Sequence, residues 1–181
     1  MIFNKAWLVQ NYHDYKTIPF LFFWGHQTSK DGSITKSCLS QWWEASFEVD
    51  GISYPTVEHW MMAGKAKLFN DKDALAHILS AASPEKAKYA GRLVHDFDPI
   101  IWDQHKVDIV IEGNKYKFNS HPELKAFLLG TGDQVLVEAS PVDMVWGIGM
   151  SAETPLVQNP SVWRGENLLG FCLMEVRTLL K

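Results

Sequence analysis

Two helix-start signals stand close together in the middle of the chain and constrain what it can fold into. Each is a small polar residue followed by proline, at Ser83-Pro84 and Asp98-Pro99. The polar side chain can cap the amides of a first turn, and proline is tolerated at the first helical position because its missing N–H costs no hydrogen bond there. Both signals predict that a helix begins at the proline.

Further helices are predicted on either side of these two starts. One follows Pro55 and runs to about Phe69, and a second covers Asp71 to Ala81. The segment "HPELKAFLLG" predicts a short helix closed by Gly130, and "NLLGFCLMEVRTLLK" predicts a last helix. In that last helix apolar residues recur at helical spacing, at Leu169, Cys172, Leu173, Val176 and Leu180.

Strand signals are fewer and shorter. "IPFLFFWG" (18–25) and "QVLVEA" (134–139) indicate two strands, and "SFEVDGISY" (46–54) indicates a hairpin with Asp50-Gly51 as its turn. Residues 26–40 are predicted to form a polar loop, and residues 141–166 look irregular. We therefore expect one domain over residues 1–181, of the α+β class and predominantly helical, with a small antiparallel β-sheet.

The overall composition excludes several classes of protein. The sequence is 46% hydrophobic and 21% charged with a formal net charge of −4, which suits a chain with a buried core. That charge argues against a protein that coats nucleic acid by electrostatics alone. No stretch approaches the roughly 18 unbroken apolar residues of a membrane span, and the first residues lack the features of a signal peptide. We expect a cytoplasmic protein with no membrane partner.

Cysteine and histidine give no sign of a metal site. Cys38 and Cys172 lie far apart without paired spacing, and Cys172 is expected to be a buried thiol because it falls within an apolar helical pattern. The seven histidines form no ligand cluster, and His59 is expected to be a structural hydrogen-bonding residue. We expect neither a metal nor an organic cofactor.

The helix after Pro55 carries the residues of greatest chemical interest. At about 100° per residue, Glu58 and Lys65 fall within about 20° of each other, beside Met62 and Phe69. This places the two charges at the border of the face that we predict to pack against the core. That face gathers Val57, Trp60, Met61, Gly64 and Leu68.

Glu58 and Lys65 each have a structural and a chemical interpretation. A glutamate in a first turn gains from the helix dipole, and Thr56 is a plausible N-cap for this helix. The same dipole favours the ionised carboxylate, which suits stabilisation of an oxocarbenium-like transition state or positioning of water. Lys65 could extend into solvent along the apolar surface, or it could hold phosphate or keep the carboxylate ionised.

An ordered set of motifs resembles the NADAR family, which is also described through YbiA-like riboflavin-intermediate N-glycosidases. "FFWG" comes first, followed by Asp50-Gly51, "YPTVEH" and an A-x-K element that ends at Lys65. "AGR" then ends at Arg92, and "LVEAS" precedes a Trp-Gly pair. "GENLLGFCLMEVR" closes the set, which spans roughly residues 20–178.

The resemblance implies a mainly helical, YbiA-like single domain and an N-glycosidase acting on ribosylated nitrogen heterocycles. It implies two substrate groups, namely phosphoribosylated early intermediates of riboflavin synthesis and ADP-ribose attached to guanine in nucleic acid. The partner would be such a ribosylated nucleotide or ADP-ribosylated guanine, with nucleic acid bound only through a modified base. Glu58 would be the catalytic carboxylate, with Lys65 nearby. The implied substrate-binding residues are Trp24, Gly25, Arg92, Trp102, Lys106, Trp146, Gly147 and Asn167.

Two positions depart from the pattern of some members. Met62 stands where those members have glutamine, and Ile148 stands where they have aspartate after Trp-Gly. A side chain that could hydrogen-bond the substrate is missing at each place, so substrate preference is not carried over from those members.

Several implied binding residues also have structural interpretations. Trp102 and Lys106 lie one helical turn apart, as a core ring beside a surface cation would. Arg92 could bind phosphate or simply favour the end of its helix. Asn167 is a credible N-cap for the last helix, where Gly170 could permit a close backbone approach and the helix start could bind an anion.

Three hypotheses about function follow. The first is a hydrolase of the bond between ribose and a nitrogen heterocycle, and the second is a non-catalytic module that binds ADP-ribose or a related nucleotide. The third is a structural domain with a degenerate pocket. The acidic net charge favours small nucleotides, but a basic face from Lys65, Lys86, Arg92 and Lys106 could reverse that preference.

Overall fold

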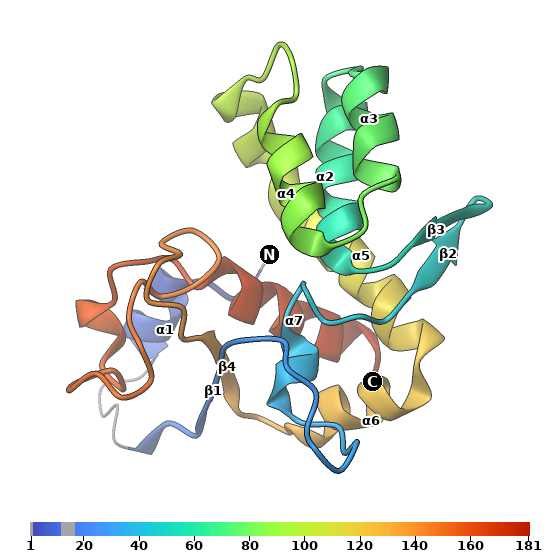
Figure 1. Ribbon diagram of the computed structural model, residues 1–181. Helices are drawn as coiled ribbons and strands as arrows, with labels where there is room; N and C mark the ends of the chain where they lie inside the picture. The colour runs from blue at the N-terminus through green and yellow to red at the C-terminus, as the bar shows by residue number, and fades with distance from the viewer. Residues whose placement is uncertain (1, 12–16) are drawn as a thin grey trace. The chain divides into compact units, whose positions relative to one another are not determined.

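The computed structural model describes residues 2–11 and 17–181. Its α-helices are α1 (Lys5–Asn11), α2 (Val57–Leu68), α3 (Lys72–Leu79), α4 (Pro84–Arg92), α5 (Pro99–Ser120), α6 (Pro122–Gly130) and α7 (Leu168–Leu179) (Figure 1). Its strands are β1 (Phe20–Phe23), β2 (Phe47–Val49), β3 (Ile52–Tyr54) and β4 (Val135–Glu138). The described residues also include the short 3₁₀ helices η2 (Lys36–Leu39) and η3 (Pro160–Val162). The expected α+β class with predominant helix is confirmed.

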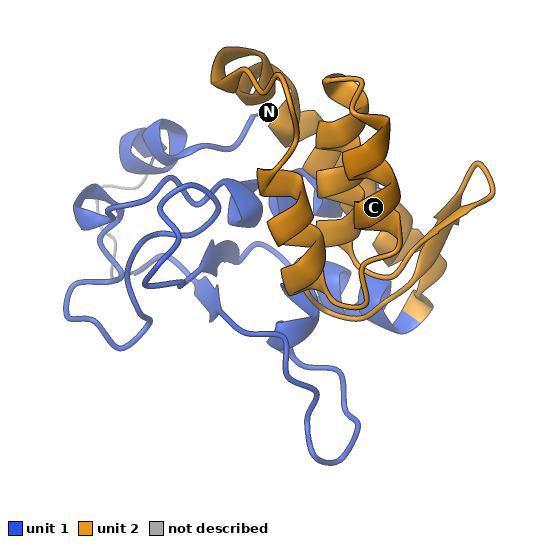
Figure 2. Cartoon of the chain, turned by 45° about the horizontal axis from the view of Figure 1, so that its top comes forward, with its two compact units in different colours: residues 1–40, 123–181 blue, residues 41–122 orange. Residues whose placement is uncertain are grey.

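The chain forms two compact units (Figure 2). Unit 2 is continuous in sequence and comprises residues 41–122, whereas unit 1 combines residues 1–40 with residues 123–181. The single domain over residues 1–181 stays a prediction.

The central helix of unit 2 is α2, which packs against α3, α4 and α5 (Figure 1). Two glycines permit its close approach to α5: a Cβ added to Gly64 would lie 2.8 Å from Ile109, and one added to Gly113 would lie 2.4 Å from Trp60. The predicted core face of α2 is correct only in part, since Val57 and Met61 are buried but Trp60, Gly64 and Leu68 are partly exposed. Met62, Ala63 and Ala66 are buried as well, because α2 packs against three helices. Glu58, expected at the border of that face, is only 2% exposed.

The helices of unit 2 begin where the polar caps predict. The Asp98 side chain accepts hydrogen bonds from the amides of Ile100 and Ile101, and the Ser83 hydroxyl accepts one from the amide of Lys86. Asp71 caps α3 through the amide of Ala74, and its second carboxylate oxygen accepts the amide of His95. These two backbone hydrogen bonds lower the pKa of Asp71 to about 2.

The hairpin of β2 and β3 is antiparallel, as predicted. Its turn residues Asp50 and Gly51 both have positive φ, at 52° and 75°, which is the backbone that a primed two-residue turn requires. The hairpin presents Phe47 and Tyr54 to one another as a stacked pair with ring centroids 5.7 Å apart.

In unit 1, β1 and β4 form a second two-stranded sheet, and this one is parallel. The antiparallel sheet expected from sequence is therefore correct for the hairpin alone, since the whole of unit 2 separates β1 from β4 along the chain. Helix α7 packs on β4. A Cβ added to Gly170 would lie 2.1 Å from the carbonyl oxygen of Leu136, which confirms the predicted close backbone approach.

Some structure lies where the sequence indicated none. Helix α1 was not predicted, and the polar loop 26–40 contains η2, which buries Cys38 and Leu39. Cys172 is buried in α7, as expected. No described helix combines the length and the apolar character needed to cross a membrane.

Candidate active site

The ten predicted site residues divide equally between the two units. Unit 2 contains Glu58, Lys65, Arg92, Trp102 and Lys106. Unit 1 contains Trp24, Gly25, Trp146, Gly147 and Asn167.

Glu58 is a buried carboxylate in the first turn of α2. The helix begins here because Thr56 is extended and its hydroxyl accepts a hydrogen bond from the amide of His59, at 3.4 Å, so the predicted N-cap is confirmed. The amide of Glu58 itself donates to the carbonyl oxygen of Gln41, at 3.1 Å. The backbone that carries the carboxylate is therefore held on both sides.

His59 ties this first turn to the segment after α3. Its Nε2 lies 3.0 Å from the carbonyl oxygen of Ala81, and its Nδ1 lies 2.8 Å from the hydroxyl of Thr56. Since a carbonyl oxygen can only accept, Nε2 carries the proton and Nδ1 accepts from Thr56. Burial lowers the pKa of His59, which favours the neutral ring that this arrangement needs. The expected structural hydrogen-bonding role is confirmed.

Lys65 lies two turns after Glu58, a rise of about 10 Å along the helix axis. Its Nζ donates a 2.8 Å hydrogen bond to the carbonyl oxygen of Gly91 and lies 3.9 Å from the centre of the Phe97 ring. The ring of Trp102 is 5.9 Å away. Burial lowers the pKa of Lys65. The lysine ammonium is therefore held against the end of α4 and beside two aromatic rings.

Met62 fills the space on α2 between the two charged side chains. A Cβ added to Gly91 would lie 2.1 Å from the Met62 sulfur, so α4 approaches α2 closely because position 91 is glycine. Met62 and Lys65 of α2 thus both contact the end of α4, at Gly91. The aromatic neighbourhood predicted for this face is present at Lys65, which lies beside Phe97 and Trp102.

The three other predicted site residues of unit 2 are more exposed to solvent than Glu58, namely Arg92, Trp102 and Lys106. Arg92 is the last residue of α4, directly after Gly91, and is exposed to solvent. Trp102 and Lys106 lie one turn apart on α5, both partly exposed. The Lys106 ammonium pairs with the Asp103 carboxylate at 2.5 Å. The structure thus brings Lys65, Gly91-Arg92 and Trp102 together. Lys106 instead forms an ion pair with Asp103 on its own helix.

In unit 1 the predicted residues gather at the carboxyl ends of β1 and β4. Trp24 follows β1 directly and is 58% exposed, and Gly25 after it has a φ of 81°. The amide of Ala139 donates to the carbonyl oxygen of Phe23 at 2.8 Å, which extends the pairing to this edge. Carboxyl ends of parallel strands are where α/β sheets commonly place ligands.

Asn167 stands at the N-cap position of α7, but its side chain does not cap the helix. Its backbone is left-handed, with a φ of 56°. Its amide oxygen accepts the Glu138 N–H and its amide nitrogen donates to the Leu136 carbonyl oxygen, both at 2.9 Å. The side-chain cap predicted from sequence is therefore wrong, because β4 lies close enough to take both ends of the amide.

The Trp146-Gly147 pair belongs to a loop that covers the start of α7. The amides of Leu168 and Leu169 donate to the carbonyl oxygens of Val145 and Trp146, so they are not available for the anion site considered from the sequence. A Cβ added to Gly147 would lie 2.9 Å from the carbonyl oxygen of Glu138. Ile148, the second departure from the family pattern, is fully buried.

Sequence reasoning did not nominate two buried polar residues, Gln41 and Lys117, or the half-buried Glu138. Gln41 precedes the hairpin without any motif to mark it, and Lys117 is fully buried in α5. Glu138 ends β4, and its Oε2 atom is inaccessible to solvent. Only Glu138 had a signal, since it is the glutamate of the "LVEAS" motif.

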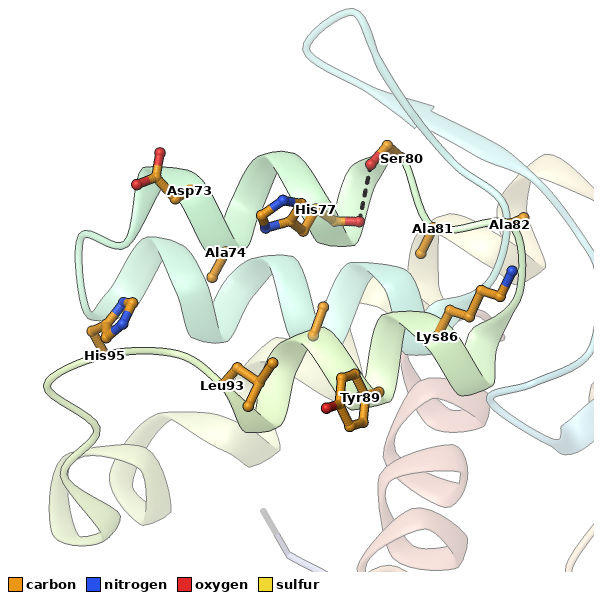
Figure 3. A pocket seen from close by; sticks show the side chains of 11 residues that line it. Asp73, Ala74, His77, Ser80, Ala81, Ala82, Lys86, Tyr89, Leu93 and His95 are labelled. Atoms are coloured by element: carbon orange, nitrogen blue, oxygen red, sulfur yellow. Dashed lines mark hydrogen bonds between the residues drawn. The ribbon is translucent and has the colours of Figure 1, made fainter.

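A pocket of about 790 Å³ opens on unit 2 at α3 and α4 (Figure 3). Its polar lining includes Asp73, His77, Lys86, Tyr89 and His95, with alanines between them. The ten predicted site residues do not line it. Over the part of the chain that the structure describes, no group of three or more His, Cys, Asp or Glu side chains could hold a metal ion.

Comparison with known proteins places these residues in a family context. The chain is 41% identical over 167 residues to N-glycosidase R617 of Acanthamoeba polyphaga mimivirus, covering 90% of this chain and 96% of that protein. It is 35% identical over 136 residues to the riboflavin biosynthesis protein PYRR, chloroplastic, of Zea mays, covering 71% of this chain and only 20% of that longer protein.

A solved structure agrees with these sequence relationships. The NMR structure of the Escherichia coli protein YbiA matches with a TM-score of 0.68 and 28% identity, over 92% of this chain and 90% of that one. The NADAR domain family matches residues 22–181. This chain therefore belongs to the NADAR family.

Proposed function

We propose that this protein is an N-glycosidase that hydrolyses the bond between a ribose and a nitrogen heterocycle. The observation that carries the proposal is the buried carboxylate of Glu58 in the first turn of α2. The helix N-terminus favours the ionised form of a carboxylate, and an ionised carboxylate can stabilise positive charge that develops on a substrate. The relatives named N-glycosidase support the same reaction class.

The reaction needs negative charge next to the anomeric carbon. As the bond from C1′ to nitrogen breaks, its electron pair leaves with the heterocycle, and positive charge develops on C1′ and the ring oxygen. Glu58 stabilises that charge or orients the water that attacks C1′. The water's oxygen forms the new bond to C1′, one of its protons is lost from the forming hydroxyl, and the heterocycle takes up one proton at the nitrogen that left.

Lys65 of α2 and Arg92 at the end of α4 would hold the phosphate of the substrate. Lys65 uses one N–H on the Gly91 carbonyl and has two more to offer, and Arg92 follows Gly91 directly. A guanidinium can bind phosphate oxygens in pairs. The rise of about 10 Å between Glu58 and Lys65 leaves room for a ribose between the anomeric carbon and its phosphate.

Tryptophan rings would hold the heterocycle. Trp102, near Lys65, offers an indole face on which a planar base can stack. Lys106 would also bind substrate, if its ammonium group leaves the Asp103 carboxylate and pairs with the substrate instead. Trp24, Gly25, Trp146, Gly147 and Asn167 of unit 1 stay predicted substrate-binding residues on the strength of the resemblance.

Two substrate groups fit this chemistry, and we propose both as candidates. One is the phosphoribosylated aminopyrimidines of early riboflavin synthesis, which the relative named as a riboflavin biosynthesis protein supports. The other is ADP-ribose attached to guanine in nucleic acid. It has the same bond from C1′ to nitrogen and also carries phosphate at the 5′ position, but its base is larger. The first needs no nucleic-acid surface and suits the net charge of −4.

A product assay tests the proposal. Purified protein is incubated separately with the phosphoribosyl-aminopyrimidine and with a guanine-ADP-ribosylated oligonucleotide, and release of free pyrimidine or of ADP-ribose is measured. The variant Glu58→Gln keeps the shape and removes the charge, so we expect its turnover to fall by about 100-fold or more.

Glu85→Gln is the matched control, because Glu85 occupies the first turn of α4 but is exposed. It should turn over substrate like the wild type. Comparable turnover by Glu58→Gln and the wild type, with both folded, would exclude the central role of Glu58. Tight binding of intact substrate without product over hours would point instead to a nucleotide-binding module.

A further inference from the structure

Gln41 is a buried amide held against the same turn that carries Glu58. Its side chain and backbone are 95% buried, and its carbonyl oxygen accepts the Glu58 N–H at 3.1 Å. That N–H is one of the first amides of α2, which have no partner inside the helix. The backbone of Gln41 is therefore fixed relative to the position of the carboxylate.

The side chain of Gln41 reaches Met61 on α2. Its Nε2 lies 3.9 Å from the sulfur of Met61, a weak acceptor. Met61 comes three residues after Glu58, so the two side chains leave neighbouring parts of the helix surface. The amide group of Gln41 thus lies on the side of α2 to which Glu58 belongs.

The other end of this amide has no hydrogen-bond donor among the residues that the structure describes. Its Oε1 atom is inaccessible to solvent. A buried polar atom left without a partner costs about 1–3 kcal/mol, and glutamine is seldom buried. A ligand that donates a hydrogen bond to Oε1 would remove this cost, at a position within one helical turn of Glu58.

We propose that Gln41 is a substrate-binding residue whose Oε1 accepts a hydrogen bond from the 2′-hydroxyl of the ribose. This inference rests on the proposed function, in which Glu58 faces the anomeric carbon. The 2′-hydroxyl is on the next ring carbon, and hydrogen bonds to that hydroxyl strengthen in glycosidase transition states. A neutral amide can accept this bond without adding a second negative charge beside Glu58.

The test compares two sugars on the complete chain by calorimetry. The probes are ribose 5-phosphate and 2-deoxyribose 5-phosphate, which differ only in the hydroxyl at issue. The wild type should bind ribose 5-phosphate about tenfold more tightly, the value of one hydrogen bond to a buried acceptor. In Gln41→Met, which keeps the length of the side chain and removes the amide, that ratio should fall to about one.

Asn114→Leu is the control for removing a buried amide. Asn114 is fully buried with an unsatisfied Oδ1, but its Nδ2 bonds within α5, to the carbonyl oxygen of Val110. This variant should keep the tenfold ratio. Equal affinity of the wild type for the two sugars, or a ratio that survives in Gln41→Met, would overturn the inference.

The measurement separates this inference from the proposed function because it needs no turnover. A protein that prefers ribose 5-phosphate through Gln41 but releases no base supports the inference and contradicts the glycosidase. A protein that releases base but binds the two sugars equally supports the glycosidase and contradicts the inference about Gln41. The wild-type comparison also requires no variant, so misfolding cannot obscure it.

Discussion

The ammonium group of Lys65 donates a 2.8 Å hydrogen bond to the carbonyl oxygen of Gly91. This contact joins the middle of α2 to the last turn of α4, where carbonyl oxygens lack partners within the helix. It also directs Lys65 toward Phe97 and fixes the residue before Arg92. One lysine therefore has a structural contact and stands where the proposal needs a phosphate ligand.

Lys65→Met should lower both stability and substrate affinity. The loss of the hydrogen bond to Gly91 and of the contact with Phe97 should reduce the free energy of unfolding by about 1–2 kcal/mol. Loss of a phosphate ligand should raise KM more than it lowers kcat. Denaturant unfolding and steady-state kinetics measure both effects. Lys72→Met, on the exposed start of α3, should change neither, and a wild-type KM in Lys65→Met would contradict the phosphate role.

Gly91→Ala should destabilise the protein by about 1–3 kcal/mol, because the new Cβ would lie 2.1 Å from the Met62 sulfur and 3.0 Å from its Cβ. Met62→Ala in the same chain should recover part of this loss, so the two changes should be non-additive. Thermal unfolding of both single variants and the double variant gives the coupling. Gly130→Ala is the control, since nothing lies within 4 Å of its added Cβ. Additive effects would show that α4 does not pack on Met62.

Stability should fall as the pH drops below the ordinary pKa of histidine, and His59 should contribute to that fall. Burial lowers its pKa in the folded protein, so at pH below about 6.5 the unfolded chain takes up a proton that the folded chain resists. The contribution is absent above that pH, grows as the pH falls, and levels off below the folded-state pKa. Unfolding free energies measured from pH 7.5 to pH 5 should therefore fall less steeply in His59→Gln than in the wild type. His77→Gln, on the exposed face of α3, should keep the wild-type slope, and equal slopes in all three proteins would refute the assignment.

Asn167 should be sensitive to two different substitutions for separable reasons. Asn167→Gly keeps a residue suited to a φ of 56° but removes the bonds to Leu136 and Glu138, which should cost about 2–3 kcal/mol of unfolding free energy. Asn167→Ala also places a Cβ in left-handed backbone, which should add about 1 kcal/mol. Denaturant unfolding of both variants measures the difference. A smaller loss for alanine than for glycine would mean that the backbone at position 167 is not left-handed in solution.

The parts of the fold that could be predicted from sequence depend on neighbouring residues. Ser83-Pro84 and Asp98-Pro99 start their helices as predicted because a cap and its amide targets lie within three residues. Asp50-Gly51 makes its turn for the same reason. These signals act before any tertiary contact forms.

What the sequence could not provide depends on distant contacts. The parallel pairing of β1 with β4 needs segments on either side of unit 2, and no local pattern encodes it. The helical period of α2 predicts one apolar face with Glu58 at its border, and it could not show that Glu58 is buried in a helix that packs against three others. Asn167 lies at the predicted N-cap position of α7, but its side chain hydrogen-bonds to the backbone of β4 instead of capping the helix.

The candidate site shows the same division. Glu58 and Lys65 were placed on one helix by spacing alone, and both lie there. Gln41 could not have been found in this way, because it precedes Glu58 by seventeen positions and only the folded chain brings its carbonyl oxygen to the first turn of α2.

The arrangement of the two units has a consequence for how the chain acquires its structure during synthesis. All residues of unit 2 leave the ribosome before β4, whereas β1 must wait for that strand through the whole of residues 41–122. Helices that follow one another along the chain close short loops and form quickly, and a parallel strand pair with a long connection forms slowly. We therefore expect the unit that carries Glu58 and Lys65 to become ordered first. Until β4 has been synthesised, β1 has an unpaired edge, and we expect incorrect strand pairing to occur there.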